Sequence, residues 1–344
     1  MNIIGGGPVG LWTAKKSADL GIDATVHEEH LRIGKPEHCT GLLSNNIDRV
    51  LAPDVVLNYI NGAKFFAGEE TILERRKVAK VIERTEFDKQ IYDEAVSSGV
   101  KVNRGSKVRW QQFKGNIVAA DGAISRTRND MGQNLGFLPA LQFDVCETPK
   151  ENFVELWFEP WNPDYFVWVV PRGNCMRVGT AARNLRPLKD FVLKRFGRFR
   201  PKATYSGLVV TSGPVKKTYF DMGERKVFLV GDSAGHVKPI SGGGLVVGMS
   251  SAEKLARALF EEKPEAYERL WRNDFGRELR MQGFVRRLMM NNPEGFVKFL
   301  KRSKIKLETS GDMDRPAKMI PHLLLPAISW VFGSLKRRKI PLNR

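Results

Sequence analysis

The sequence NIIGGGPVG occupies residues 2–10 and decides the fold that we expect for this chain. It matches the pattern Gly-x-Gly-x-x-Gly, begins with the short apolar run Asn2–Ile4, and leads into an apolar helical stretch, Leu11–Leu20. The helix is expected to end at Gly21, and a second strand is predicted at Ala24–His27. Strand, glycine turn, helix and strand in this order are typical of the βαβ unit that opens a nucleotide-binding fold.

The spaced glycines have separate roles in such a loop. Gly5 permits the tight turn, Gly7 lets the backbone approach a pyrophosphate, and Gly10 lets the helix pack closely on the strand. The free amides at the helix start, together with the positive end of the helix dipole, then bind the phosphates. Glu28 follows Gly10 by 18 residues, where a carboxylate bonds the ribose of an adenosine, and its neighbour Glu29 is the alternative.

Two later blocks indicate which dinucleotide binds. VFLVGDSAG at residues 227–235 is an apolar strand that leads to Gly231 and Asp232, and a glycine run and a helix follow it. A carboxylate at such a turn can bind a polyol, and free amides at a helix start can face an anion or a ring carbonyl. VAADGAISRTR at residues 118–128 has Asp-Gly after a strand and before a basic turn. FAD has a ribityl chain and an isoalloxazine ring, which NAD lacks, so we predict FAD as the cofactor.

These three blocks, in this order, resemble those of FAD-dependent oxidoreductases of the aromatic-hydroxylase type, and most closely those of the geranylgeranyl reductase family. That family includes archaeal enzymes that saturate isoprenoid chains of membrane lipids. IGKPEHCTGL at residues 33–42 resembles its cysteine loop near the flavin, and ERTEFD at residues 83–88 resembles its segment with a cofactor-binding arginine. YFVWVVP at residues 165–171, followed by Gly-Thr-Ala at residues 179–181, resembles its aromatic substrate-pocket motif.

The resemblance implies a set of site residues. Cys39 is implied to act in catalysis, at the flavin edge or as a proton source, and the alternative is a small buried hydrophobic residue. The substrate pocket is implied to be lined by Tyr165, Phe166, Trp168 and Pro171. The residues implied to bind the cofactor are Gly5, Gly7, Pro8, Val9, Gly10, Glu28, Cys39, Thr40, Gly41, Arg84, Val108, Asp121, Gly122, Gly231, Asp232, Gly243, Gly244 and Leu245.

Aromatic and histidine residues near these motifs have a second interpretation. Strand alternation places Phe166 and Trp168 on one face and Tyr165 on the other, which also suits an ordinary sheet core. His38 and His236 stand beside family motifs, where either could assist proton transfer. A turn residue whose ring is hydrogen-bonded is the simpler expectation for both histidines.

The chain has three cysteines, Cys39, Cys146 and Cys175, and none of them forms a CxxC pair. An odd number without such a pair indicates neither a disulfide framework nor a zinc site, and we expect no bound metal. Cys146 and Cys175 lie in strand patterns, and we expect them to be structural. With no signal-peptide pattern after Met1, we expect a cytoplasmic protein, peripheral on the inner face of the membrane if its C-terminus binds lipid.

The predicted fold class is α/β, with α+β character overall. Residues 1–139 and 216–284 are expected to form a Rossmann-type FAD-binding domain that is discontinuous in sequence. Residues 140–215 carry a succession of strand patterns and are expected to form an inserted, mostly antiparallel substrate sheet. Residues 285–344 are expected to be a basic, helical C-terminal segment.

The chain of 344 residues has 56 Lys and Arg against 38 Asp and Glu, a net charge of +18. This charge indicates an anionic partner, and 42% hydrophobic with 27% charged residues excludes a disordered or collagen-like chain. Residues 285–344 hold fourteen basic and four acidic residues, a net charge of +10. With the apolar stretch 319–333 and the basic run Lys336–Lys339, they suit an anchor on an anionic membrane, a nucleic-acid patch, or a solvated helix face. No nucleic-acid motif accompanies them, so nucleic acid is the least favoured partner.

We predict an FAD-dependent reductase that saturates carbon–carbon double bonds of geranylgeranyl-type chains, in membrane lipids or prenyl diphosphates. The reduced flavin would supply the hydride. The electron donor, NAD(P)H or a ferredoxin-like protein, stays open because no second dinucleotide domain is visible. Two alternatives remain: a flavin-dependent monooxygenase or halogenase on the same fold, and a flavoprotein that binds membrane or RNA without reducing a lipid.

Overall fold

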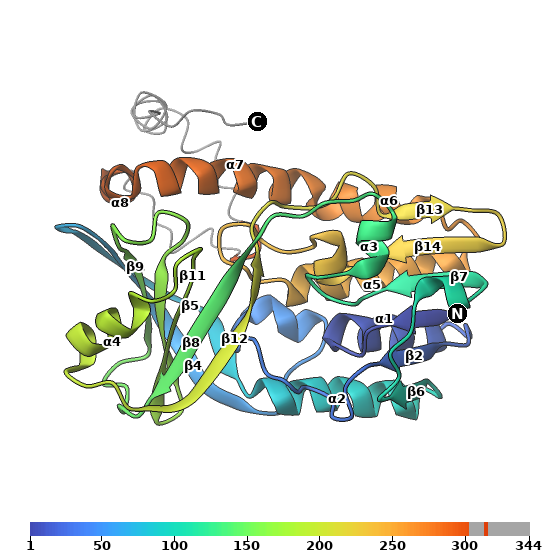
Figure 1. The fold of residues 1–344 in the computed structure, drawn as a ribbon, viewed down its shortest axis with the longest axis horizontal. Helices are drawn as coiled ribbons and strands as arrows, with labels where there is room; N and C mark the ends of the chain where they lie inside the picture. Colours follow the sequence, from blue (N-terminus) through green and yellow to red (C-terminus); the bar gives the residue numbers. More distant parts are fainter. Residues whose placement is uncertain (303–312, 316–344) are drawn as a thin grey trace. The chain divides into compact units, whose positions relative to one another are not determined.

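A computed structural model of the chain describes residues 1–302 and 313–315, and they divide into two compact units. Unit 1 comprises Met1–Val56, Ile82–Phe137 and Val209–Arg280, and unit 2 comprises Leu57–Val81, Leu138–Leu208 and the described residues from Met281 onward (Figure 1). Each unit is therefore assembled from segments that are far apart in the sequence.

A six-stranded sheet forms the centre of unit 1, with the strand order β13-β14-β7-β1-β2-β6. Its strands are β1 (Asn2–Ile4), β2 (Thr25–Glu28), β6 (Lys101–Arg104), β7 (Gly115–Ala119), β13 (Tyr219–Asp221) and β14 (Arg225–Leu229). Strands β14, β7, β1, β2 and β6 are parallel, and β13 joins β14 antiparallel at the edge. The carboxyl ends of the parallel strands therefore meet at one edge, where open α/β sheets bind their ligands.

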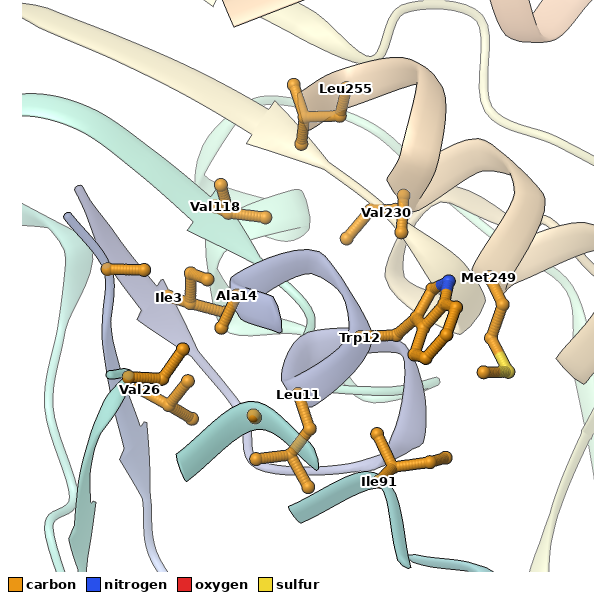
Figure 2. Close-up of a cluster of buried hydrophobic side chains, with 14 of the residues drawn as sticks. Ile3, Leu11, Trp12, Ala14, Val26, Ile91, Val118, Val230, Met249 and Leu255 are labelled. Atoms are coloured by element: carbon orange, nitrogen blue, oxygen red, sulfur yellow. The ribbon is translucent and has the colours of Figure 1, made fainter. Parts of the chain in front are cut away.

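Three helices pack against the core of unit 1: α1 (Pro8–Ala18), α2 (Arg84–Ser97) and α5 (Leu245–Phe260). Proline suits the first position of α1, and Lys15 and Lys16 in its last turn complement the helix dipole. Figure 2 shows Leu11 and Trp12 of α1 among the other buried side chains of this core. Short helical segments complete the unit: η1 (Asn45–Arg49), η2 (Trp110–Gln112), α3 (Arg126–Asp130), η3 (Gly231–Ala234), α6 (Ala266–Trp271) and the π-helical η4 (Arg272–Gly276).

The second sheet has eight strands in the order β12-β8-β11-β10-β9-β4-β5-β3. They are β3 (Leu42–Ser44), β4 (Val56–Ala67), β5 (Glu70–Ile82), β8 (Phe137–Val145), β9 (Phe153–Phe158), β10 (Val167–Arg172), β11 (Cys175–Ala181) and β12 (Pro201–Val210). Strands β8, β11, β10 and β9 are antiparallel neighbours, whereas β4 pairs with β9 in parallel. Helix α4 (Leu188–Phe196) packs Leu188 and Val192 against Val167 and Val169, which alternation places on the same face of β10.

The predicted fold class is confirmed, because a largely parallel sheet with helices is joined to a mostly antiparallel sheet. The strands β4 and β5 were not predicted. The sequence analysis placed residues 57–81 with the nucleotide-binding domain, but Leu57–Val81 group with unit 2. The physical reason is the pairing of β4 with the distant β9, where Gly62 lies opposite Phe153, since such a contact leaves no local pattern.

The described part of the basic C-terminal segment packs on unit 2. It comprises the part of α7 (Arg277–Asn291) from residue 285 onward, α8 (Pro293–Arg302) and residues 313–315, all of which belong to unit 2. In α8, Val297 and Phe299 are buried, and the ring of Phe296 meets the ring of Phe158 edge-on at 6.3 Å. Most of the stretch proposed as a membrane anchor, including residues 319–333 and Lys336–Lys339, lies outside the described residues. Within the described part, no helix combines the length and apolarity needed to cross a membrane.

We expect Val297→Asp to destabilise unit 2, because it buries a carboxylate at a position with no exposed surface. The loss should exceed roughly 3 kcal/mol and lower the thermal unfolding midpoint followed by circular dichroism. The matched control is Lys298→Asp, which places the same carboxylate on the exposed neighbouring position. If both variants unfold at the same temperature, α8 is not packed as described.

Candidate functional site

The glycine loop is built so tightly that two of its glycines cannot carry a side chain. A Cβ atom on Gly10 would lie 2.1 Å from the carbonyl oxygen of Gly5, and one on Gly5 would lie 2.3 Å from the carbonyl oxygen of Ala120. Gly5 also has a φ of +106°, which strongly favours glycine. The turn therefore brings the start of α1 directly onto the ends of β1 and β7.

Gly7 has the opposite environment, because a Cβ atom there would meet no atom within 4 Å. It is the N-cap of α1, and no side chain hydrogen-bonds to the first amides of that helix. Unpaired amides at the positive end of a helix, beside open space, suit a phosphate group. The two residues that follow, Pro8 and Val9, form the first turn of α1. This part of the site fits the pyrophosphate that the sequence predicted.

Glu28 lies beside the glycine loop. It is the last residue of β2, one residue beyond the predicted strand end, and its Oε2 accepts a hydrogen bond of 2.6 Å from the amide of Gly6. Its Oε1 accepts the backbone amide of His30 at 2.8 Å. The same oxygen lies 2.6 Å from Nδ1 of His30. Glu29, the alternative for the ribose contact, forms an ion pair of 2.9 Å with Lys107 and has no contact with the glycine loop among the hydrogen bonds of the described residues. The geometry therefore favours Glu28 over Glu29 as the carboxylate next to a bound nucleotide.

The Gly231-Asp232 block is held against α1 through Val9. A Cβ atom on Gly231 would lie 3.1 Å from Cγ1 of Val9, and one on Gly248 would lie 2.7 Å from its Cγ2. Val9 therefore fits between the turn after β14 and helix α5. Two blocks that are more than 200 residues apart in the sequence are joined at this one contact.

Asp232 faces the start of α5. A Cβ atom on Gly244 would lie 3.1 Å from its Oδ1, and Gly244 is an N-cap without a side-chain hydrogen bond, so the amides from Leu245 onward are available. Burial raises the pKa of Asp232, and the positive charge of Arg84 opposes that rise. A Cβ atom on Gly243 would lie 2.9 Å from Cε of the buried Lys238. This arrangement suits the polyol and ring contacts that the sequence predicted.

Arg84 connects the cysteine loop with α2. Its Nη2 donates to both carboxylate oxygens of Asp88, at 2.8 and 3.1 Å, and its Nε donates to Oδ1 at 3.2 Å. Burial alone would lower the pKa of Arg84, but the carboxylate of Asp88 and the sulfur of Cys39 raise it above its usual range. Arg84 is therefore a buried, charged contact of Cys39. The sequence analysis missed the partner, Asp88, although the i, i+4 spacing on a helix was a usable signal.

The loop of Cys39 is anchored by its own backbone. The amide of Gly41 donates to the sulfur of Cys39 at 3.4 Å, while the amide of Ile82 donates to the carbonyl of Gly41 at 2.9 Å. Gly41 has a φ of +83°, and a Cβ atom on it would lie 2.6 Å from the carbonyl oxygen of Ile82. Thr40, between them, is half-buried. Only glycine fits this position, which lets the loop approach the backbone of Ile82 closely.

Asp121 follows β7 at the same sheet edge, and a Cβ atom on Gly5 would lie 3.0 Å from its Cα. Burial raises its pKa, and hydrogen bonds from Ser125 and nearby backbone amides lower it. One buried oxygen, Oδ1, has no hydrogen-bond partner among residues 1–302 and 313–315. Gly122 beside it has a φ of +77° and open space in the direction of a Cβ. An unpaired acceptor next to open backbone again fits a polar ligand. Val108 was also predicted to bind the cofactor, and its side chain packs against an apolar cluster.

His236 stabilises the turn at Gly231. Its Nδ1 accepts the amide of Gly231 at 3.3 Å, and its ring packs on Trp271 with centroids 4.5 Å apart. Burial, together with the charges of Arg272 and Lys254, lowers its pKa to about 3. The ring is therefore neutral near pH 7, and because Nδ1 accepts a hydrogen bond, its single proton is on Nε2. His38, in contrast, is exposed.

The aromatic residues that were predicted to line the substrate pocket form a compact cluster in unit 2. Their positions do not follow the alternation of side chains along a strand. Strand β10 begins at Val167, so Tyr165 and Phe166 precede it. The ring of Tyr165 stacks on Phe166 with centroids 4.3 Å apart and meets Trp168 edge-on at 6.3 Å. The expectation that Tyr165 lies on the face opposite to Trp168 was therefore wrong. Pro171, within β10, is buried.

This aromatic cluster contains polar atoms without partners. Tyr165 Oη, Trp168 Nε1 and Arg286 Nε are all buried and make no hydrogen bond with the residues that the structure describes. The guanidinium of Arg286, on α7, lies 5.5 Å from the ring centre of Tyr165, and its Nη2 donates to the backbone carbonyl of Asp164. Burial raises the pKa of Tyr165. The sequence analysis did not single out Arg286, because no motif connects it with residues 165–171.

Comparison with known proteins places this fold and these motifs in context. No family model matches the chain. A digeranylgeranylglycerophospholipid reductase of Methanocaldococcus jannaschii is 26% identical, over 78% of this chain and 81% of the relative. The resemblance to geranylgeranyl reductases is confirmed. An uncharacterized protein of the same organism is 29% identical, over 92% of both chains.

Solved structures agree on the fold. A geranylgeranyl bacteriochlorophyll reductase-like protein of Thermoplasma acidophilum has a TM-score of 0.81 at 19% identity, over 98% of both chains. A flavin-dependent brominase has a TM-score of 0.69 at 14% identity, over 98% of this chain and 99% of the other. The chain therefore has the fold of flavin-dependent oxidoreductases.

We expect Gly10→Ala to destabilise the chain by roughly 1–3 kcal/mol, because its Cβ would overlap the carbonyl oxygen of Gly5. Gly7→Ala is the matched control, since its Cβ enters open space at a φ of −71°, and it should change stability by less than about 1 kcal/mol. Urea titration of both variants checks this. Equal losses would contradict the described turn.

Acid should destabilise the chain through His236. Its pKa is about 3 in the folded chain against an ordinary 6.5, so the unfolded chain binds the extra proton between these values. Stability should therefore fall as pH is lowered from 6.5 toward 3, by at most ~1.4 kcal/mol per pH unit from this group. His236→Asn, which keeps an acceptor for Gly231, should flatten the pH profile of the unfolding midpoint. Identical profiles for His236→Asn and the wild type would refute the assignment.

Proposed function

We propose that unit 1 binds FAD. The amides at the start of α1 would hold the pyrophosphate and Glu28 the adenosine ribose. Asp121 and Asp232 would contact the remaining polar groups, and the free amides at the start of α5 would face the ring. The observation that carries this proposal is the convergence of these groups at one sheet edge, with an unpaired Asp121 oxygen and open space at Gly7.

We further propose that the protein is an oxidoreductase that saturates carbon–carbon double bonds of prenyl chains. Support comes from relatives named digeranylgeranylglycerophospholipid reductase, which match about four-fifths of the chain. Reduced flavin, when bound, would supply the hydride. The chain's own part would be to orient an apolar substrate and keep water from it.

Cys39 is the residue that we propose to lie at the reacting end of the flavin. The amide of Gly41 and the guanidinium of Arg84 both contact its sulfur, so its position is set by the loop and by α2. Asp88 pairs with Arg84 and would act as a positioning residue, because it touches Cys39 only through that arginine. In this arrangement Cys39 would contact the flavin edge or deliver the proton that completes the reduction.

The aromatic cluster of unit 2 is the proposed substrate wall. Tyr165 and Phe166 are almost fully buried, and apolar rings suit an isoprenoid chain. The unpaired donors of Tyr165, Trp168 and Arg286 would suit an acceptor group on the substrate. A prenyl lipid or a prenyl diphosphate carries both an apolar chain and such acceptor oxygens.

A flavin-dependent monooxygenase or halogenase is the second candidate, favoured by the likeness to the brominase along nearly the whole chain. A flavoprotein that binds membrane or RNA without reducing a lipid stays a prediction, as does the choice between NAD(P)H and a ferredoxin-like donor. A cytoplasmic, peripheral location and an anionic membrane partner for the C-terminus are likewise predictions.

The test is to reconstitute the full chain with FAD, reduce the flavin without oxygen, and add a geranylgeranyl lipid or geranylgeranyl diphosphate. We expect the flavin spectrum to return to the oxidised form, and the product to gain two hydrogens per saturated bond by mass spectrometry. Cys39→Ser should keep the bound flavin and slow its reoxidation by roughly 100-fold or more if the thiol supplies the proton. Cys146→Ser is the matched control.

Absence of both a bound flavin spectrum and reoxidation by either substrate would overturn the reductase proposal. Substrate-stimulated oxygen consumption with a hydroxylated or halogenated product would favour the second candidate instead. Wild-type rates in Cys39→Ser would remove the cysteine from the reaction while leaving FAD binding in place.

A further inference from the structure

Two cysteines from distant positions in the sequence meet at the end of a strand pair in unit 2. Strands β8 and β11 are antiparallel, with Asp144 opposite Arg177 and Val145 opposite Met176. Strand β8 ends at Val145, and one more step of this register beyond its end would bring Cys146 opposite Cys175. Burial raises the pKa of Cys175, and Cys146 raises it further by charge and by a hydrogen bond between the side chains. The two sulfurs are therefore neighbours, and both cysteines are free thiols.

The spacing of opposite residues in such a pair suits a disulfide. Directly opposed residues of antiparallel strands have Cα atoms about 4.5–5.5 Å apart, within the roughly 4.4–6.8 Å that a disulfide spans. Cys146 is exposed and Cys175 half-buried, so a small oxidant can reach the first sulfur. The register next to them is anchored by the buried ion pair between Arg177 and Asp144, at 2.7 Å.

We propose that Cys146 and Cys175 form a reversible disulfide by exchange with a low-molecular-weight disulfide. The thiolate of Cys146 attacks one sulfur of the small disulfide, which releases one small thiol and leaves a mixed disulfide. The thiol of Cys175 then loses its proton and attacks the Cys146 sulfur, which releases the second small thiol. The two protein thiols are oxidised by two electrons, and the small disulfide is reduced to two thiols. Cys39 takes no part.

The bond would close a loop from residue 146 to residue 175, which contains all of β9 and all of β10. The same loop carries Tyr165, Phe166 and Trp168. Cross-linking its two ends lowers the conformational entropy of the unfolded chain and so favours the folded one. The redox state of this cysteine pair would thus set the stability of the strands that carry the aromatic cluster.

Peptide mapping of the full chain tests the proposal directly. The protein is treated with oxidised glutathione, remaining thiols are alkylated, and the chain is cleaved with trypsin without reductant. We expect the peptide of residues 129–150 linked to that of residues 173–177, with a mass two hydrogens below their sum. The link should disappear after dithiothreitol. Free or singly glutathionylated peptides at both positions would overturn the proposal.

Single variants separate this cysteine pair from Cys39. In the wild type, oxidation should raise the unfolding temperature by roughly 5 °C, and reductant should reverse the rise. Cys146→Ser and Cys175→Ser should each abolish the rise, whereas Cys39→Ser should retain it. A rise that persists in Cys146→Ser, or one that is lost in Cys39→Ser, would refute the assignment.

Discussion

The contact between Gly10 and the carbonyl of Gly5 is the constraint on which unit 1 depends. It sets α1 directly on the end of β1, at a distance that no side chain larger than hydrogen allows. Because α1 is placed so closely, Val9 can fit between Gly231 and Gly248, and helix α5 is held in turn. The large core of unit 1, which includes side chains of α1, α2 and α5, packs around this arrangement (Figure 2).

Unit 1 buries several charged side chains, and burying a charge costs free energy unless a partner or a ligand compensates for the lost water. Arg84 is paired with Asp88, so one buried ion pair is satisfied. Asp121 keeps a buried oxygen without a partner, and burial raises the pKa of both Asp121 and Asp232. Acceptors that are held in place but left unpaired are typical of binding sites, since a ligand can offset their desolvation. This is the physical basis for proposing a polar cofactor along the carboxyl edge of the sheet.

Unit 2 combines an apolar cluster with isolated donors. The rings of Tyr165, Phe166 and Trp168 pack together, and the guanidinium of Arg286 lies over Tyr165. In the same unit, Val297 and Phe299 of α8 are buried, so the lysines of α8 lie on a helix that packs within unit 2. The part of the basic segment that the structure describes therefore has a structural role. This role does not depend on which anionic partner the charge of the whole segment attracts.

The sequence alone determined the elements whose signals are local. The glycine loop, the succession of strands between residues 140 and 215, and the block around Gly231 could all be predicted, because periodicity and turn residues act over a few neighbours. Glu28 was identified by its spacing from Gly10. The resemblance to geranylgeranyl reductases rested on the same local motifs.

Only the tertiary structure decided which distant residues meet. It paired β4 with β9, gave Tyr165 its position beside Trp168, brought Arg286 to that cluster, and set Cys146 next to Cys175. None of these contacts leaves a periodic trace in the sequence, because each depends on the register of strands or the packing of a helix far along the chain. Local sequence patterns specified the individual strands, helices and turns, and long-range packing specified which of them are neighbours.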